Sequence, residues 1–402
     1  MNKSTATSYC RKIEILSIAG LLFILPFEGT NTIQEILFFS LISAFLVKNI
    51  SEYKNISSTL SLPSKTLTAL IIISFLWGVI ALINAVDPAY SFHEIVTKMS
   101  KQFILYFLSF FIVREIPFER IKWLLFPIVF STLIMSIYAC YQFYQLPVFF
   151  ENRVSGFTGA FYRLCTFLIL SIPLIAVLAF TLHGWIKRIL FITVFISLIA
   201  VFFTFTRAAW IAVIVESSIL IIILLKKYRK FILSLIIAIS LIVIGLSYKS
   251  VIPNWLIVHG SEKPRIEALK LSAEIIRKNP ITGIGYGKRS FSKYYPNIEE
   301  VKHTHNVFLN TAIELGVTGL IIFMAMLVLI SKDFLVSLKK ERLFDRKLIL
   351  GGIFALFIGF LSMNLFDYMY HGWPGQMLWM LIGIGYALMN PASGTNTSSR
   401  HT

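Results

Sequence analysis

The sequence predicts an all-α, polytopic helical membrane protein with about twelve transmembrane helices and one large loop on the outer side. The chain is 57% hydrophobic and 14% charged over 402 residues, whereas soluble domains carry about 25% charged residues. Apolar runs of about 20 residues, the length that crosses the hydrocarbon core of a bilayer, recur along the chain. Basic residues gather in alternate connecting segments, as the positive-inside rule describes for multi-span proteins. These observations exclude a soluble globular fold.

The apolar runs define the predicted spans. One run, from Ile189 to Leu225, is nearly twice as long as a single span, so a tight turn is expected near residues 205–207. The first run ends at 26–28 without a small-residue cleavage motif, which predicts a retained span rather than a cleaved signal peptide. The fourth run begins with Lys98 and Lys101, charges that spanning helices rarely carry. The twelve predicted spans are residues 13–28, 33–50, 66–84, 99–114, 121–144, 161–182, 186–205, 208–225, 230–248, 307–331, 347–369 and 374–390.

The basic residues predict which connecting segments face the cytoplasm. Segments rich in Lys and Arg alternate with short segments such as 28–31 and 370–375, which contain neither. Both termini are therefore expected in the cytoplasm. Much of the formal net charge of +17 is then a topology signal rather than a nucleic-acid-binding surface. The residues that carry the pattern are Lys3, Arg11, Lys12, Lys48, Lys54, Lys65, Arg114, Arg120, Lys122, Lys187, Arg188, the cluster at 226–230 and the basic residues of 332–347.

One outer segment, residues 249–306, is too charged to insert, and it divides the chain. Residues 1–248 hold the first nine predicted spans and residues 307–390 the last three, while residues 391–402 are predicted to be a disordered cytoplasmic tail. Apolar residues at helical spacing within 266–278 predict a short helix lying on the membrane face, which Pro280 ends.

Residues able to carry chemistry gather at the outer side. Arg207 lies in an otherwise apolar hairpin, where it is either an interfacial anchor beside Trp210 or a clamp for phosphate oxygens. Arg265 lies in the outer loop, where an ordinary solvated charge is the alternative to a functional role. His303 and His305 precede the tenth predicted span. The topology alone brings these residues to one side of the membrane.

The two histidines suit acid–base chemistry better than metal binding. Two residues apart, they would point in different directions on a helix, and no third ligand is near in the sequence, so no metal site is expected. A neutral imidazole is a suitable general base because its pKa lies near the operating pH. A helix-end histidine without a chemical role is the alternative. Asn306 is placed to cap the tenth span.

Ionisable residues inside predicted spans mark functional positions. Glu314 is either such a group or the buried partner of an arginine. Asp367 lies near an outer end, where it can orient an imidazole or bind a sugar hydroxyl. The GIGYG sequence at 283–287 follows a helix and a proline rather than a strand, so it does not predict a dinucleotide site. It predicts a flexible turn, or a close approach of the backbone to a lipid or sugar.

The chain resembles the O-antigen ligase family, whose relatives include O-antigen polymerases and protein O-oligosaccharyltransferases. The similarity is carried by Arg265 together with NPITGIGYG at 279–287, HTHNVFL at 303–309 and ELGVTG at 314–319, and by a second motif, TRAAW at 206–210. These motifs occur in the family's order. The layout of twelve spans with one large outer loop is also similar along most of the chain.

The resemblance implies a glycosyltransferase of the bacterial inner membrane that uses neither metal nor cofactor. The donor would be an O-antigen glycan on undecaprenyl diphosphate, and the acceptor a hydroxyl of the lipid A-core. The histidine before asparagine, His305, would be the general base of an inverting displacement at the periplasmic face. Arg207 and Arg265 would stabilise the diphosphate leaving group.

The resemblance also suggests which residues contact the substrates, and it leaves alternatives open. Substrate contacts are expected from His303, Asp367, Tyr286 and Asn306. A polymerase using the same chemistry is the nearest alternative, although a single dominant outer loop favours a ligase. A protein O-oligosaccharyltransferase usually carries an additional C-terminal portion. A lipid-linked sugar transporter would need broken helices and ionisable groups near the bilayer midplane. A structural scaffold would leave the outer residues unexplained.

Overall fold

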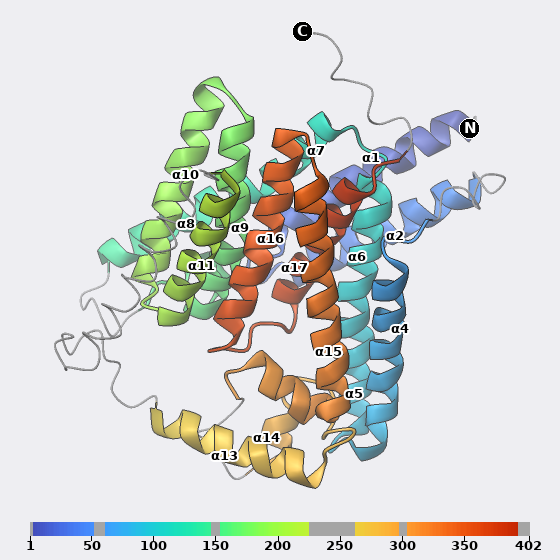
Figure 1. The fold of residues 1–402 in the computed structure, drawn as a ribbon, viewed down its shortest axis with the longest axis vertical. Coiled ribbons are helices and arrows are strands. Elements are labelled where there is room, and N and C mark those ends of the chain that lie inside the picture. Colours follow the sequence, from blue (N-terminus) through green and yellow to red (C-terminus); the bar gives the residue numbers. More distant parts are fainter. Residues whose placement is uncertain (1–2, 52–60, 146–152, 225–261, 297–303, 393–402) are drawn as a thin grey trace.

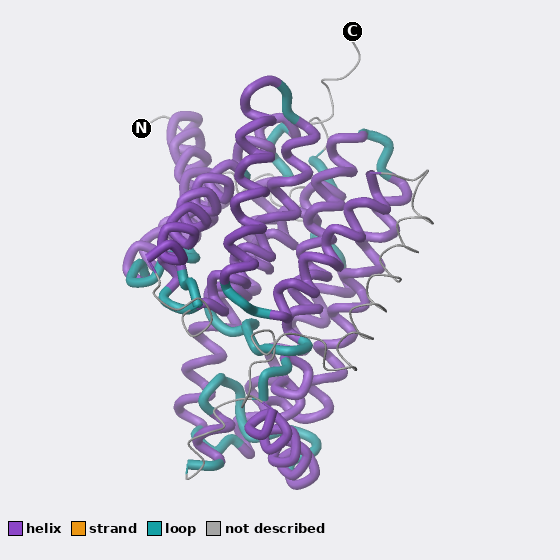
Figure 2. Tube along the Cα trace, turned by 90° about the vertical axis from the view of Figure 1, so that its left-hand side faces the viewer, coloured by secondary structure: helices purple, strands orange, loops and turns teal. Residues whose placement is uncertain are grey.

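The computed structural model describes residues 3–51, 61–145, 153–224, 262–296 and 304–392 (Figure 1). Every regular element in these residues is helical, and Figure 2 shows helices joined by short loops with no strand in the described part of the chain. The predicted fold class, an all-α polytopic membrane protein, is thereby confirmed. The ninth predicted span, His303, the start of the outer loop and residues 393–402 of the predicted tail lie outside the described residues.

The helices follow the apolar runs. They are α1 (Lys3–Ile24), α2 (Asn31–Ser51), α4 (Lys65–Ile80) with η2 (Ala81–Asn84), α5 (Pro88–Glu94), η3 (Ile95–Met99), α6 (Ser100–Val113), α7 (Phe118–Leu124), α8 (Phe126–Gln145), η4 (Gly156–Thr158), α9 (Phe161–Thr181), α10 (Gly184–Phe203), α11 (Arg207–Leu224), α13 (Glu262–Lys278), α14 (Ser290–Tyr294), α15 (Val307–Lys340), α16 (Phe344–Asn364) and α17 (Trp373–Met389). The expected turn near 205–207 is present, because α10 ends at Phe203 and α11 begins at Arg207.

Eight segments of the described chain are long and apolar enough to cross a membrane. They are Asn31–Ser51, Lys65–Asn84, Pro88–Val113, Phe118–Gln145, Phe161–Thr181, Gly184–Phe203, Val307–Lys340 and Phe344–Asn364. Each overlaps one of the predicted spans, although Pro88–Val113 begins earlier and Val307–Lys340 ends later than predicted. Helices α1, α11 and α17 coincide with three more predicted spans without meeting the same criteria, and the total of twelve stays a prediction.

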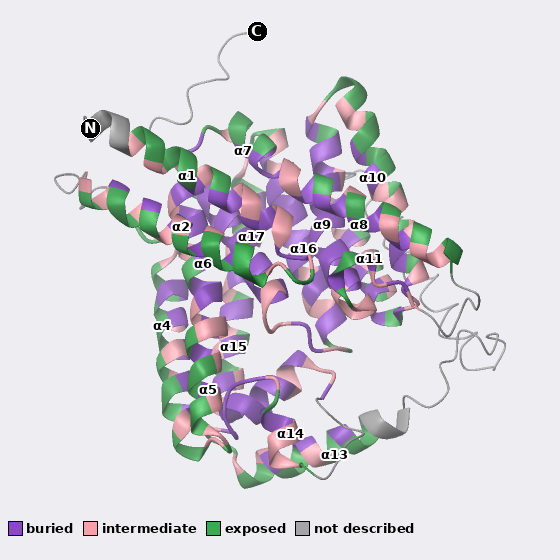
Figure 3. Ribbon diagram, turned by 180° about the vertical axis from the view of Figure 1, so that it is seen from behind, coloured by how far each residue is buried: buried purple, intermediate pink, exposed green. Residues whose placement is uncertain are grey.

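The helices pack around an apolar core and turn other apolar faces outward. Helix α17 lies along α6, α9 and α11 lie against α16, and α1 pairs with α2 (Figure 1). In the core, the Tyr106 ring meets the Trp379 and Tyr386 rings edge-on, with centroids 5.6 and 5.8 Å apart. The outer faces of α2, α4 and α10 are exposed in Figure 3 and carry large apolar side chains such as Leu76 and Phe195. In a bilayer these apolar side chains would contact lipid tails instead of water.

The structure groups the connecting segments as the basic-residue pattern does. At the end where α1 begins and α17 ends, Lys48 pairs with Glu14 and Glu115 at 3.0 and 3.2 Å, and Lys122 pairs with Asp345 at 2.7 Å (Figure 1). These residues come from segments predicted to face the cytoplasm or from the helix ends beside them. Helices α5, α13 and α14, from segments predicted to face outward, lie at the opposite end.

Helix α15 is broken at Gly316, within the tenth predicted span. Gly316 has φ 72° and ψ 178°, a conformation essentially restricted to glycine. The break frees three carbonyl groups, which neighbouring segments satisfy. Ile284 N–H donates to Ile313 O at 2.9 Å and Gly285 N–H to Glu314 O at 3.1 Å. The indole N–H of Trp77 donates to Leu315 O at 2.8 Å.

The glycine-rich sequence at 283–287 therefore has a defined structural role. It lies against the break in α15. Gly283, whose φ is +68°, is the residue where the loop backbone comes close to the backbone of Gly316. A Cβ at Gly283 would lie 2.6 Å from Gly316 N, so only glycine fits there. The expected turn is present, and it is packed against α15. The backbone does make a close approach at this loop, and its partner is α15.

The predicted surface helix is confirmed as a helix, α13, which ends at Lys278 just before Pro280. Its apolar residues divide between two faces. Ile275 is buried in a small cluster with Ile284 and Ile313, whereas Ile266 and Leu269 are exposed. Contact of this helix with the membrane stays a prediction.

Candidate functional site

A polar cavity of about 920 Å³ lies at the end of the helices that the basic-residue pattern predicts to face outward. Its volume falls within the range of small-molecule and cofactor pockets. Its walls come from the α1–α2 loop, α2, the α5–α6 region, the start of α9, the loop before α14 and the α16–α17 loop. Charged or aromatic lining residues are Glu28, Glu35, Tyr90, His93, Glu94, Lys98, Lys101, Tyr162, Arg163, Lys288, Arg289, Tyr368, His371 and Trp373.

The wall formed by α5 and α6 explains the two lysines at the start of the fourth predicted span. Asp87 caps α5 by accepting the Tyr90 N–H, with Pro88 at the first helical position. One π-helical turn, η3, then joins α5 to α6, and such turns are frequent at functional sites. Lys98 lies in this turn and Lys101 at the start of α6, and both line the cavity. The crossing segment thus begins at Pro88 and carries its lysines on the cavity side.

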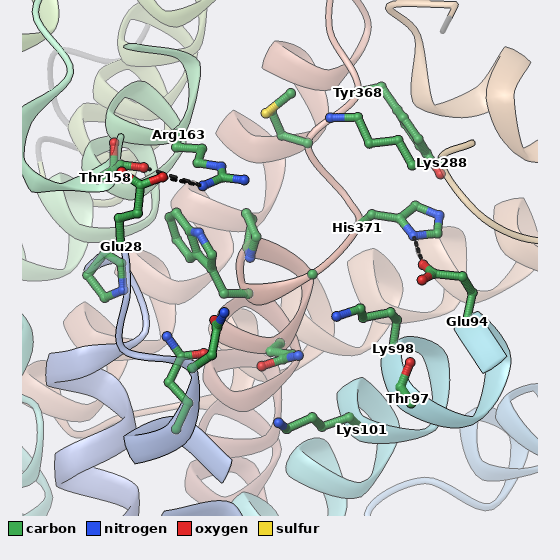
Figure 4. Close-up of a pocket in the computed structure, with 18 of the residues that line it drawn as sticks. Glu28, Glu94, Thr97, Lys98, Lys101, Thr158, Arg163, Lys288, Tyr368 and His371 are labelled. Carbon is green, nitrogen blue, oxygen red and sulfur yellow. Dashed lines mark hydrogen bonds and ion pairs between the residues drawn. The ribbon is translucent and has the colours of Figure 1, made fainter. Parts of the chain in front are cut away.

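Basic side chains from four elements point into the cavity. Figure 4 shows Lys98, Lys101, Lys288 and Arg163 directed toward the same space. Lys101 pairs with Glu35 at 2.6 Å, and Arg163 lies 3.8 Å from a carboxylate of the α1–α2 loop. Burial is the main cause that lowers the pKa of Lys288, while the negative charge of a nearby aspartate opposes it.

A buried imidazole links the cavity wall to α15. His371 Nε2 lies 3.4 Å from Glu314 Oε2, and its Nδ1 lies 3.8 Å from Glu94 Oε2 (Figure 4). The His371 side chain is 7% exposed, and the rings of Tyr286 and Tyr368 lie against it at 4.7 and 5.2 Å. Three elements, α5, α15 and the α16–α17 loop, are thus joined at one histidine.

Glu314 is the centre of the hydrogen bonds behind this wall. Its Oε1 accepts the Asn310 side-chain N–H at 2.6 Å and the Tyr368 hydroxyl at 3.0 Å. With His371 on its other oxygen, the carboxylate is held by three side chains. Glu314 is therefore a buried anchor, and the alternative of an arginine partner is not realised in the described residues.

His305 and Asp367 lie together beside the cavity. His305 Nδ1 is 3.6 Å from Asp367 Oδ1, and the same carboxylate oxygen accepts the N–H of Tyr368, a cavity residue, at 2.8 Å. Asn306 caps α15, as expected, by accepting the Leu309 N–H at 2.9 Å, and its amide also donates to Leu365 O at 2.9 Å. This second bond ties the His305 segment to the segment that carries Asp367.

Both non-glycine residues with positive φ in the described chain adjoin predicted catalytic positions. His305 itself has φ 52°, and Phe205, two residues before Arg207, has φ 48°. Such conformations are uncommon outside glycine, and they cluster at functional sites. The signal lies in the backbone, so sequence reasoning had no access to it.

The other predicted site residues are placed as follows. Arg207 is exposed at the first position of α11. Arg265 lies in α13, but its side chain is outside the described set. Tyr286 is 5% exposed behind His371 rather than on the cavity wall, and its burial raises the pKa of its hydroxyl. His303 is not described.

Sequence reasoning missed much of the cavity. It did not select Arg163, Lys288 or Glu94, which come from three separate segments. The only sequence feature that could have indicated cavity residues was a charged residue next to an apolar run, as at Lys98 and Lys101. Charge of this kind looks the same whether a side chain lines a cavity or lies in water.

Comparisons with known proteins find a family-model match for the central part of the chain. Residues 192–324 match the family model described as O-antigen ligase, a segment that includes Arg207, Arg265 and His305. No curated protein matches the chain. A solved structure titled "Structural coordination of polymerization and crosslinking by a peptidoglycan synthase complex" is similar at 16% identity with a TM-score of 0.47, covering 81% of this chain and 96% of that chain. The match over residues 192–324 supports the similarity of this part of the chain to the O-antigen ligase family.

Proposed function

We propose that the protein is an O-antigen ligase. It transfers O-polysaccharide from undecaprenyl diphosphate to a hydroxyl of the lipid A-core at the periplasmic face of the inner membrane. The observation that carries this proposal is the His305–Asp367 pair beside a large polar cavity, with His305 inside the matched ligase domain.

In the proposed reaction the acceptor oxygen attacks the anomeric carbon of the donor sugar. The bond from that carbon to the diphosphate oxygen breaks as the new glycosidic bond forms, so the configuration inverts. His305 takes the proton of the acceptor hydroxyl. Asp367, 3.6 Å from His305 Nδ1, stabilises the imidazolium that results. Arg207 and Arg265 neutralise the charge that grows on the diphosphate.

The break in α15 bears on the transporter alternative. A transporter would place a broken helix where its backbone contacts the substrate. Here the carbonyls freed at Gly316 are bonded to Ile284, Gly285 and Trp77 of the same chain. Glu216 is a buried carboxyl within α11, yet it lies against Gly359 rather than in the cavity. These features fit a fixed scaffold for catalysis better than alternating access.

The test is complementation of a deletion strain with the intact chain or its His305→Ala variant, expressed to equal levels. Lipopolysaccharide is resolved by size, and lipid-linked glycan is assayed in parallel. We expect only the intact chain to restore capped lipopolysaccharide, with long lipid-linked glycan accumulating in the variant. His183→Ala, which changes an exposed histidine at the start of α10, is the matched control and should complement fully.

Two results would contradict the proposal. Single-unit caps on the core in the deletion strain would identify a polymerase. Full activity of the His305→Ala variant would remove this histidine from the mechanism.

A further inference from the structure

The cavity carries more positive charge than its own carboxylates balance. Five of its lining residues are Lys or Arg, and three are Glu. One glutamate, Glu35, is already paired with Lys101, and Glu94 lies beside His371. Lys98 and Lys288 make no ion pair with any described residue.

Holding these cations in one partly enclosed space is unfavourable without an anion. Like charges repel, and desolvation penalises each ammonium. Lys288 shows both effects, since burial and the charge of Arg163 each lower its pKa. Lysines and an arginine directed at one space from separate elements are typical of phosphate sites, because phosphate oxygens accept charge-assisted hydrogen bonds from several directions.

The cavity adjoins the proposed base through Asp367. Asp367 is hydrogen-bonded to the cavity residue Tyr368 and faces His305. A base must lie within reach of the acceptor hydroxyl. Arg207, the proposed clamp for the donor diphosphate, is not among the described residues that line the cavity.

We propose that Lys98, Lys288 and Arg163 bind a phosphate group on the acceptor glycolipid. The inference rests on the proposed function, and it adds the substrate class that this cavity selects: a phosphorylated sugar next to the hydroxyl that attacks. Aromatic lining residues such as Tyr162 and Trp373 give the sugar rings apolar faces to pack against. The phosphate contact fixes the acceptor before transfer, and the donor diphosphate is held elsewhere.

The experiment uses the full chain in nanodiscs with a Lys98→Gln/Lys288→Gln double variant. Its matched control is Lys270→Gln, which changes an exposed lysine of α13 outside the cavity. The KM for the acceptor, the KM for the donor and kcat are measured separately. The acceptor is lipid A-core, either intact or after removal of its phosphates.

With intact acceptor, we expect the double variant to raise the acceptor KM about tenfold, which corresponds to about 1.4 kcal/mol, and to leave the donor KM unchanged. With dephosphorylated acceptor, wild type and variant should have the same acceptor KM. The charge-retaining variant Lys98→Arg/Lys288→Arg should bind intact acceptor nearly as well as wild type, which separates loss of charge from loss of fold.

Other results would overturn the inference. A parallel rise in the donor KM would assign these cations to the donor diphosphate. An effect that persists with dephosphorylated acceptor would exclude a phosphate contact. If wild type transfers nothing to lipid A-core, the proposed function fails. Direct binding of lipid A-core to the nanodisc-held protein then tests the cavity by itself, and equal affinity for wild type and the double variant would refute the inference.

Discussion

The contact between the glycine-rich loop and α15 can be tested by one added methyl group. Gly283 and Gly184 both have φ +68°, but a Cβ at Gly184 meets nothing within 4 Å, whereas at Gly283 it would overlap Ile313 O. Left-handed backbone costs a residue with a Cβ about 1–2 kcal/mol, so Gly184→Ala should cost about that much. Gly283→Ala adds overpacking of about 1–3 kcal/mol. It also strains the two loop hydrogen bonds to α15, worth about 0.5–1.5 kcal/mol each.

The total for Gly283→Ala is therefore about 3–8 kcal/mol, against about 1–2 kcal/mol for the control. Thermal unfolding of both variants in the same detergent, together with a transfer assay, measures the difference. We expect the Gly283→Ala melting temperature to fall well below that of Gly184→Ala, by about 5 °C or more, and transfer to be lost. Equal melting temperatures and equal activity would refute the account of this loop as a rigid cap on α15.

Four further predictions follow from single contacts. Lys48→Met should cost about 3–5 kcal/mol of unfolding free energy by leaving the fully buried Glu14 unpaired, and adding Glu14→Gln should recover most of it. Trp77→Phe should cost about 1–2 kcal/mol through the lost bond to the α15 break, and unchanged stability would argue against that cap. Asp367→Asn should lower kcat about 100-fold with little change in acceptor KM in steady-state assays. Because burial lowers the pKa of Lys288, its charge is lost at a lower pH than in the unfolded chain. Stability should therefore rise with pH between that lowered pKa and 10.5, and the Lys288→Gln variant should lack this rise in pH-dependent unfolding.

The sequence was informative where a property depends on neighbouring residues. An apolar run of a given length becomes a spanning helix whatever surrounds it, because a helix alone satisfies its backbone in lipid. Helix ends follow the same local rule: Asn306 could be predicted to cap α15, and Pro280 to end α13. The alternation of basic segments predicted which loops lie together, and the ion pairs of Lys48 and Lys122 join segments of one predicted side.

Prediction from single segments failed where the hydrogen-bond partners of a segment come from elsewhere in the chain. The break at Gly316 is stable because the freed carbonyls meet N–H groups of residues 284 and 285 and the Trp77 side chain, which the α15 sequence does not contain. The glycines at 283–287 looked flexible because nothing nearby in the chain explains them.

The sequence by itself determined the membrane class, the helices and the family motifs around His305, because each is encoded in short stretches of chain. The tertiary structure decided the site. Packing of the helices places Asp367 beside His305. It places His371 between Glu94 and Glu314. The basic side chains of the cavity point into one space as a result of the same packing. The physical reason is that a cavity and its charge balance depend on distances between side chains of separate helices, and those distances are set by packing.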